Sequence, residues 1–265
     1  MLIVGERINS TRENIREAIG KRDRAFIIKE VSKQIAAGAT FVDINCAVTS
    51  GDEVEDIDWV LGVIQSELAD VSISIDSPNY LAIERAIKVY NAKSGLMINS
   101  ITAEDRRIDD ILPLALKADA KLIALTMNDK GMPDTAEDRT IIARAILDRV
   151  KKDGFNPKNL YFDPLIRPIS TEPAQAIEFL RSIPMIKDLG ANTICGLSNV
   201  SFGLPDRKLI NSTFLAMAVY AGLDAAILDP TDKLMNSNLK ASLAIVGEDD
   251  YCADYIKAFR DGNLI

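Results

Sequence analysis

The chain has 265 residues, 48% of them hydrophobic, and a formal net charge of −8 with a pI of about 4.8. That length suits one large α/β domain, and the negative charge argues against nucleic acid or an anionic membrane as a partner. The sequence contains no histidine, which excludes Ser-His-Asp and Cys-His nucleophile sites, HExxH zinc sites and histidine-ligated cofactors. We therefore expect chemistry based on Asp, Glu, Asn and Ser, with Lys or Arg, and no metal bound by this chain.

Eight short apolar runs follow one another along the chain, and each ends at a polar or acidic residue before helical sequence begins. About 33 residues per unit is close to the norm for a (β/α)8 barrel of about 250 residues. No Gly-x-Gly-x-x-Gly follows the first run, which disfavours an open nucleotide-binding sheet. We predict a single-domain (β/α)8 TIM barrel over residues 1–265, with strands that end at Glu6, Asn45, Asp76, Asn99, Asn128, Asp163, Asn199 and Asp229.

Helix signals lie between these runs. Apolar residues recur every three or four positions over 52–69, which predicts a helix with one buried face and an acidic, solvated start. Ser77, followed by proline, and Thr102, the start of a capping-box pattern, predict two helix N-termini. The segment 199–223 is long enough for a short helix before the main one, and 232–262 predicts two closing helices.

The strand ends predict a shared site, because active sites of parallel barrels form at the C-terminal ends of the strands. Each Asp or Asn alone can be a helix N-cap. However, four of them end the apolar run itself, where a cap would come later: Asp76, Asn99, Asp163 and Asn199. Such a ring suits a neutral, planar ligand with several hydrogen-bonding groups, such as the 2-amino-4-oxopyrimidine of pterins and guanine. We see no glycine-rich turn or basic cluster for a phosphorylated ligand.

Short motifs carry a more specific resemblance. They are GERIN (5–9), DIN (43–45), IDS (75–77), INS (98–100), FDP (162–164) and CGLSNVSF (195–202). In this order they resemble the pterin-binding methyltransferase family. That family includes corrinoid iron–sulfur protein methyltransferase and the folate-binding module of cobalamin-dependent methionine synthase. The resemblance extends over essentially the whole chain.

The resemblance implies a role for each matching residue. Asp76, Asn99 and Asp163 would hold the pterin ring, and Asn199 would lie near N5 of the folate. Gly196 and Ser198 would line the same wall, and Arg207 could meet the benzoyl-glutamate tail. Phe202 stands where acetogen-type members carry glutamine and methionine synthases carry phenylalanine, so its role is open.

The implied reaction moves a methyl group between N5 of tetrahydrofolate and the cobalt of a corrinoid (cobalamin). Breaking the N5–methyl bond of 5-methyltetrahydrofolate requires a proton or strong hydrogen bond at N5, and an Asn199 amide N–H is the plausible donor, with the proton arriving from solvent. One preorganised donor is worth ~2.7–4 kcal/mol. The family's corrinoid modules use an Asp-x-His-x-x-Gly loop, so a separate corrinoid protein is expected as partner. A homodimer is expected from the resemblance alone.

Two other functions are left open. A dihydropteroate synthase-like enzyme would need a pterin pyrophosphate and p-aminobenzoate, and this chain lacks the late Ser-Arg-Lys of those enzymes. A non-catalytic folate-binding subunit would bind folate without turnover. The direction of methyl transfer and the upstream methyl donor are also undetermined. We expect Glu6 to anchor the first βα loop rather than act as a base.

The remaining sequence features indicate the cellular compartment of the protein. Three cysteines, Cys46, Cys195 and Cys252, are widely spaced and odd in number, which indicates reduced thiols. We expect the first two to be small apolar fillers near strand ends. The chain has no signal-like start, and its apolar runs fall short of the ~20 residues of a membrane span. These features predict a cytoplasmic protein.

Overall fold

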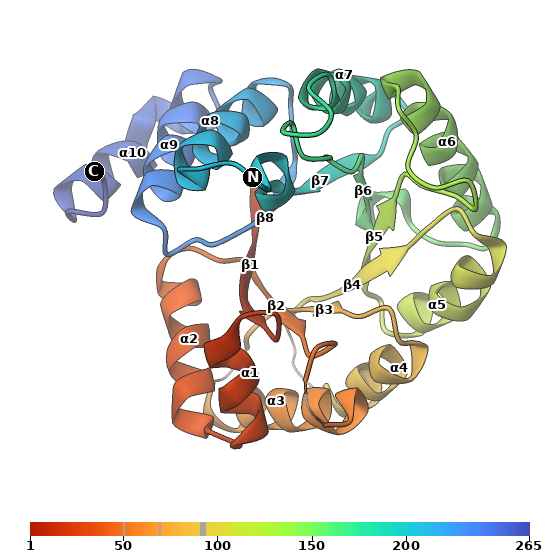
Figure 1. The fold of residues 1–265 in the computed structure, drawn as a ribbon, viewed down its shortest axis with the longest axis vertical. Helices are drawn as coiled ribbons and strands as arrows, with labels where there is room; N and C mark the ends of the chain where they lie inside the picture. Colours follow the sequence, from red (N-terminus) through yellow and green to blue (C-terminus); the bar gives the residue numbers. More distant parts are fainter. Residues whose placement is uncertain (50, 69, 91–93) are drawn as a thin grey trace.

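The computed structural model describes residues 1–49, 51–68, 70–90 and 94–265. Eight parallel strands pair in chain order, and β8 pairs with β1, which closes the barrel (Figure 1). The predicted single-domain (β/α)8 barrel is confirmed. The strands are β1 (Leu2–Asn9), β2 (Phe41–Asn45), β3 (Ile73–Asp76), β4 (Leu96–Ile101), β5 (Lys121–Leu125), β6 (Leu160–Asp163), β7 (Asn192–Gly196) and β8 (Ala225–Leu228).

Helices form a ring outside the strands (Figure 1). The α-helices are α1 (Glu13–Gly20), α2 (Arg24–Ala36), α3 (Glu53–Glu67), α4 (Tyr80–Val89), α5 (Asp105–Lys117), α6 (Ala136–Lys152), α7 (Gln175–Lys187), α8 (Arg207–Tyr220), α9 (Lys233–Ile245) and α10 (Ala253–Arg260). Short 3-10 helices are η1 (Pro157–Asn159), η2 (Leu197–Ser201) and η3 (Asp250–Cys252). The short helix expected before α8 is η2, and the two expected closing helices are α9 and α10.

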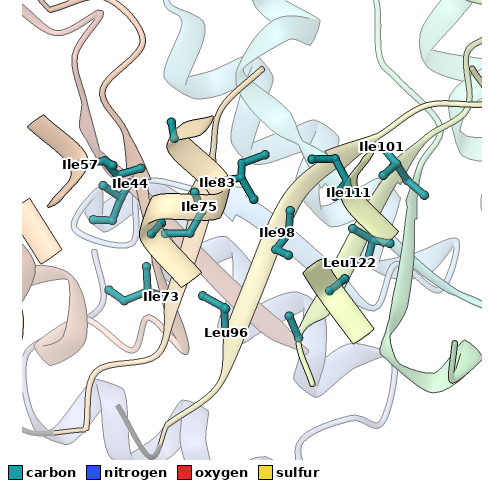
Figure 2. Close-up of a cluster of buried hydrophobic side chains, with 14 of the residues drawn as sticks. Ile44, Ile57, Ile73, Ile75, Ile83, Leu96, Ile98, Ile101, Ile111 and Leu122 are labelled. Atoms are coloured by element: carbon teal, nitrogen blue, oxygen red, sulfur yellow. The ribbon is translucent and has the colours of Figure 1, made fainter. Parts of the chain in front are cut away.

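Apolar side chains on the outer face of the strands hold the helices in place. Figure 2 shows Ile44, Ile75 and Ile98 of the strands facing Ile57, Ile83 and Ile111 of the helices, and all six are fully buried. Burying one such side chain contributes about 1.5–3 kcal/mol, far more than helix propensity contributes per residue. Because both faces of the sheet are covered, the strands are continuously apolar.

This outer core is divided into two clusters. The larger cluster lies mainly under α1–α6 and includes Ile8, Ile75 and Val150. The smaller cluster lies under α7–α9 and includes Phe179, Phe214 and Leu239. The ring of helices has a gap between α2 and α9 (Figure 1). Residues of α2, α9 and α10 line a groove of about 610 Å³ there.

A third cluster fills the interior of the barrel. Its buried members come from seven strands: Val4, Phe41, Met97, Ile123, Tyr161, Ile194 and Ala225. They alternate with outward-facing residues along their strands, as barrel geometry requires. This apolar layer fills the barrel below the C-terminal ends of its strands. The polar residues above the layer therefore line a closed depression, here called the mouth, and not a channel through the barrel.

Five of the eight predicted strand ends are wrong. β4 continues past Asn99 to Ile101, and β8 ends at Leu228, one residue before Asp229. β1 continues past Glu6 to Asn9, with a register irregularity in its pairing with β2, and the Arg7 N–H is donated to the side chain of Gln34 at 3.0 Å. β5 ends at Leu125 instead of Asn128, and β7 ends at Gly196 instead of Asn199. After β7 the apolar pattern continues because Leu197 is buried within η2. Hydrophobicity alone therefore does not mark where the strand pairing ends.

The two predicted caps are also wrong. Asn79 caps α4 by accepting from Leu81 N at 3.0 Å, while Ser77 instead donates to Glu53 Oε1 at 2.6 Å. The N-cap of α5 is Glu104, with no side-chain capping bond. The helix predicted over 52–69 is confirmed for Glu53–Glu67, with Asp52 as its cap, and position 69 lies outside the described residues.

Candidate functional site

Strand register brings two of the predicted site residues together at the barrel mouth. Asp76 of β3 pairs directly with Asn99 of β4. With Ser77, Leu125 and Arg107 they line an open pocket of about 340 Å³. The Arg107 guanidinium donates to the backbone carbonyls of Ser77, Pro78 and Ser100, so it braces the two loops beside the pocket.

Asp76 is oriented by a residue that the site prediction did not include. Asn45 Nδ2 donates to Asp76 Oδ2 at 2.8 Å, and Asn45 Oδ1 in turn accepts from Ala47 N at 3.1 Å. Burial raises the pKa of Asp76, the Asn45 hydrogen bond opposes that rise, and the Glu53 carboxylate adds to it. The asparagine of the DIN motif therefore positions one oxygen of Asp76 and leaves the other for a ligand.

Asp163 lies on the opposite wall and is held by the backbone. Its Oδ1 accepts from Leu165 N at 2.8 Å, and its Oδ2 accepts from Gly196 N at 3.4 Å. Burial raises its pKa to about 6, although these N–H groups favour the carboxylate. At neutral pH the group is mostly ionised, and a carboxylate has further lone pairs for ligand N–H donors. The structure thus brings the two predicted site residues Asp163 and Gly196 into contact.

The remaining predicted residues lie on η2 and the start of α8. Asn199 is exposed at the mouth. Arg207 Nη2 donates to the Ser198 carbonyl at 2.5 Å, and its Nε donates to Ser201 Oγ at 3.0 Å. Arg207 therefore fixes the turn that carries Asn199, a role the sequence did not indicate. Phe202 is 63% exposed.

Two further carboxyl groups lie deeper in the mouth. Asp43 is fully buried, and its Oδ1 has no hydrogen-bond partner among the residues that the structure describes. Burial and the nearby charge of Asp76 raise its pKa well above the usual range. Burial also raises the pKa of Glu6, to about 7. The expected contact of Glu6 with the first βα loop exists as an ion pair with Arg12 at 3.5 Å.

A buried arginine supports the Asp163 loop and was missed by sequence reasoning. Arg139 of α6 is fully buried and donates to the Pro164 carbonyl at 2.7 Å and to Gln175 Oε1 at 2.6 Å. It also donates to the Leu165 carbonyl at 3.4 Å. An arginine in a charged helix is normally read as solvated. Its partners Pro164, Leu165 and Gln175 lie 25 or more residues away, so no local pattern indicates this supporting role.

Metal-ligand groups, cysteines and helix lengths complete the description of the structure. Within the described ranges, no group of three or more His, Cys, Asp or Glu residues is arranged to hold a metal ion. Cys46 and Cys195 are buried, as expected for apolar fillers, and Cys252 is exposed. No helix in the part of the chain that the structure describes is long and apolar enough to cross a membrane.

These walls together define the class of site. Carboxylates and amides from β2, β3, β4 and β6 surround a mouth that an apolar layer closes from below. The arrangement suits a neutral, planar molecule with several N–H and C=O groups, because fixed buried partners reject a ligand that leaves them unpaired. The protein is a (β/α)8 barrel with a mouth lined by carboxylate and amide side chains.

Comparisons with known proteins identify the family to which this barrel belongs. The model of the family described as "Pterin binding enzyme" matches residues 5–229. A methylcorrinoid:tetrahydrofolate methyltransferase from Eubacterium limosum is 35% identical over 269 residues, which cover 100% of this chain and 98% of that protein. The chain belongs to the pterin-binding enzyme family, and it is a methyltransferase.

More distant relatives share part of this similarity. A methionine synthase from Mycobacterium tuberculosis is 28% identical over 246 residues, which cover 86% of this chain but 20% of that protein. A dihydropteroate synthase from Xanthomonas albilineans, solved with 6-chloroguanine, superposes with a TM-score of 0.70 over 92% of both chains at 16% identity. That structural likeness shows a shared fold.

Proposed function

We propose that this chain transfers a methyl group between the cobalt of a corrinoid carried by a separate protein and N5 of tetrahydrofolate. The observation that carries the proposal is full-length 35% identity to a methylcorrinoid:tetrahydrofolate methyltransferase. The polar mouth supports it, because Asp76, Asn99 and Asp163 offer the carboxylates and amide that a pterin ring requires. The name of that relative favours transfer toward the folate.

In this proposal Asp163 and Asp76 bind the pterin ring from opposite walls. The Asp163 carboxylate accepts from the exocyclic amine and the adjacent ring N–H, while Asn99 serves the remaining polar atoms. Gly196 and Ser198 line the wall between Asp163 and Asn199. Hydrogen bonds to a charged group contribute about 1.5–3 kcal/mol each, so two such bonds would provide much of the affinity.

Asn199 is the proposed donor to N5. Its amide N–H would stabilise the electron pair that develops on N5 when the methyl–nitrogen bond breaks, and it aids the reaction only as far as this bond strengthens in the transition state. One such donor is worth about 2.7–4 kcal/mol, so orientation of the two reactants must supply much of the rest. The exposure of Asn199 suits a methyl group delivered from another protein.

The corrinoid is a co-substrate in this proposal. The absence of histidine from the chain supports a carrier protein that brings the corrinoid to the open mouth. We further propose a cytoplasmic homodimer. Apolar side chains exposed on α8, α9, η3 and α10 support association of two copies: Tyr220, Ile245, Tyr251 and Phe259.

The direct test is anaerobic methyl transfer with free cofactors. Methylcobalamin with tetrahydrofolate, and Co(I) cobalamin with methyltetrahydrofolate, are followed by the change in corrinoid absorbance. We expect transfer in both directions by the wild type, and a loss of about 100-fold in Asn199→Ala. Asp188→Asn, an exposed substitution at the end of α7, serves as the control.

Other outcomes identify the alternatives. Folate binding without transfer, even with added corrinoid proteins, would indicate a binding subunit. Condensation of a pterin pyrophosphate with p-aminobenzoate would indicate a dihydropteroate synthase-like enzyme, an alternative that has support at the level of fold. No folate binding at all would reject the proposed function.

A further inference from the structure

A small cavity beside η2 is lined by a partly buried acid, Glu6, that the proposed mechanism does not use. The cavity has a volume of about 70 Å³ and is lined by Glu6 of β1, Ser198 of η2 and Asn211 of α8, among others. Ser198 immediately precedes Asn199, the proposed donor to N5. The cavity is large enough for water, which needs only about 10–15 Å³, so a water molecule can lie between Glu6 and Ser198.

Glu6 differs from the other carboxyl groups of the mouth in its hydrogen bonding. Both oxygens of Asp163 accept backbone N–H groups, and Asp76 accepts from Asn45. Among the residues that the structure describes, Glu6 forms one ion pair, with Arg12 at 3.5 Å. A carboxyl group that accepts few hydrogen bonds can gain and lose a proton with little rearrangement around it.

An orphaned acceptor in the same cavity favours a protonated Glu6. Asn211 Oδ1 is buried and has no hydrogen-bond partner among the described residues. An unpaired buried acceptor costs about 1–3 kcal/mol. A protonated carboxyl group is a donor, whereas a carboxylate is not. A Glu6 O–H, directly or through a cavity water, would therefore satisfy Asn211.

The charges around Glu6 nearly balance, so burial dominates its ionisation. Arg12 and Arg207 favour the carboxylate, and Asp229 disfavours it. Most of the nearby charged groups are already paired: Arg7 with Asp229 at 2.8 Å, and Lys208 with Asp232 at 2.6 Å. Buried Asp43 on β2 also faces Glu6. The resulting pKa of about 7 lies at neutral pH, and a general acid or base is most effective when its pKa is near the pH of the reaction.

We propose that Glu6 is the proton reservoir of the methyl transfer, exchanging a proton with N5 of the folate through water in the cavity beside Ser198. The inference rests on the proposed function. Toward the folate, the N5 lone pair forms the new bond to the methyl carbon, and the electron pair of the broken methyl–cobalt bond stays with the corrinoid. The proton of N5 then passes to the Glu6 carboxylate. In the opposite direction protonated Glu6 returns that proton as N5 receives the electron pair of its broken bond.

The two directions have opposite pH dependences, which gives a sharp test. Initial rates are measured in both directions from pH 6 to pH 8.5 with methylcobalamin and tetrahydrofolate, or Co(I) cobalamin and methyltetrahydrofolate. In the wild type the rate toward folate should fall as pH decreases through about 7, because Glu6 must be ionised. The rate from folate should fall as pH rises through the same value, because Glu6 must be protonated.

Glu6→Gln keeps the shape of the side chain but cannot exchange a proton. We expect both inflections near pH 7 to disappear and the rate at pH 7 to fall about 100-fold, within the range for general acid–base catalysis. The tetrahydrofolate Kd should stay within about threefold of wild type. Glu6→Asp retains an ionisable carboxyl group and should keep an inflection. Glu248→Gln, exposed beyond α9, is the matched control, and circular dichroism verifies that each variant folds.

Each contrary result has a distinct meaning. Wild-type pH profiles and a rate within about threefold of wild type in Glu6→Gln would overturn the inference and leave the proposed function intact. Equal losses of rate and folate affinity with the inflections retained would make Glu6 a binding residue and also overturn it. No transfer by the wild type in either direction would reject the proposed function, and this inference with it.

Discussion

Asp163, a proposed pterin-binding residue, is buried at some cost to the stability of the fold. Its carboxyl group is 8% exposed, and burial raises its pKa to about 6 even though two backbone N–H groups contact it. A buried carboxylate is kept in such a place only if its charged form is needed. In the proposed function that need is the pair of N–H donors on the pterin ring.

Asp163→Asn is expected to weaken tetrahydrofolate binding by about 10- to 100-fold at pH 8, the equivalent of one or two charged hydrogen bonds. Wild-type affinity should also weaken as pH falls through about 6, because a protonated carboxyl group loses acceptor capacity. The variant should lack that pH dependence. Anaerobic calorimetry at pH 5.5 and 8 measures both effects, with Asp188→Asn as control. Equal affinities in variant and wild type would place the pterin elsewhere.

Asp43 allows the effect of a buried acid on the stability of the fold to be measured. Its raised pKa means that folding favours the protonated acid. The stabilisation associated with this group is therefore present below the ordinary aspartate pKa and is lost as pH rises through the folded-state value, by up to about 1.4 kcal/mol per pH unit. Asp43→Asn removes this loss.

We expect Asp43→Asn to increase the free energy of unfolding by about 1 kcal/mol or more at pH 8, with a gain that shrinks toward pH 4. Urea denaturation at both pH values measures the difference. Asp188→Asn should change little at either pH. A variant that is less stable than wild type at pH 8 would show that Asp43 has an ionised partner in the fold.

At the level of elements, the loops of the mouth are held by arginines that donate hydrogen bonds to backbone carbonyls. Arg107 braces the β3–α4 and β4–α5 loops, Arg139 braces the β6–α7 loop, and Arg207 braces η2. The planar guanidinium can satisfy several carbonyls from one side chain, which lysine cannot do. The loops that carry Asp163 and Asn199 thus depend on side chains from neighbouring helices.

Arg139→Lys is expected to lower the free energy of unfolding by about 2–3 kcal/mol, because at least one buried carbonyl is left without a donor. Folate affinity should fall as well, since the loop after Asp163 loses its support. Urea denaturation and calorimetry measure the two effects. Arg144→Lys, exposed on the same helix, is the control. Unchanged stability would mean that water or the lysine ammonium satisfies the same carbonyls.

The sequence predicted the kind and order of the elements but not their limits. Alternation of apolar runs and helical periods was sufficient for the barrel, because both faces of each strand are buried. The end of β7 was missed because Leu197 and Val200 stay buried in η2 after the ladder stops. The supporting roles of Asn45 and Arg139 depend on contacts across 25 or more residues, which local patterns do not encode.

For the whole molecule, the proposed homodimer makes a prediction about the surface of α8–α10. Sedimentation should give twice the monomer mass for the wild type. Tyr220→Asp with Phe259→Asp should shift the protein toward the monomer, because charges replace apolar contacts at the proposed interface. Ile141→Asp, an exposed apolar position on α6, should have no effect. A monomeric wild type would reject the dimer.

The division of the outer core into two clusters affects how the molecule opens. Segments that share a hydrophobic cluster tend to unfold together, and hydrogen exchange detects such units. The boundary between the clusters separates β3 and β4 from η2 and α8, so Asp76 and Asn99 belong to one unit and Asn199 to the other. A folate bound between them would contact both, and its binding energy would oppose their separate opening. Substrate would then slow amide exchange in α8 and β7, far beyond the residues that it touches.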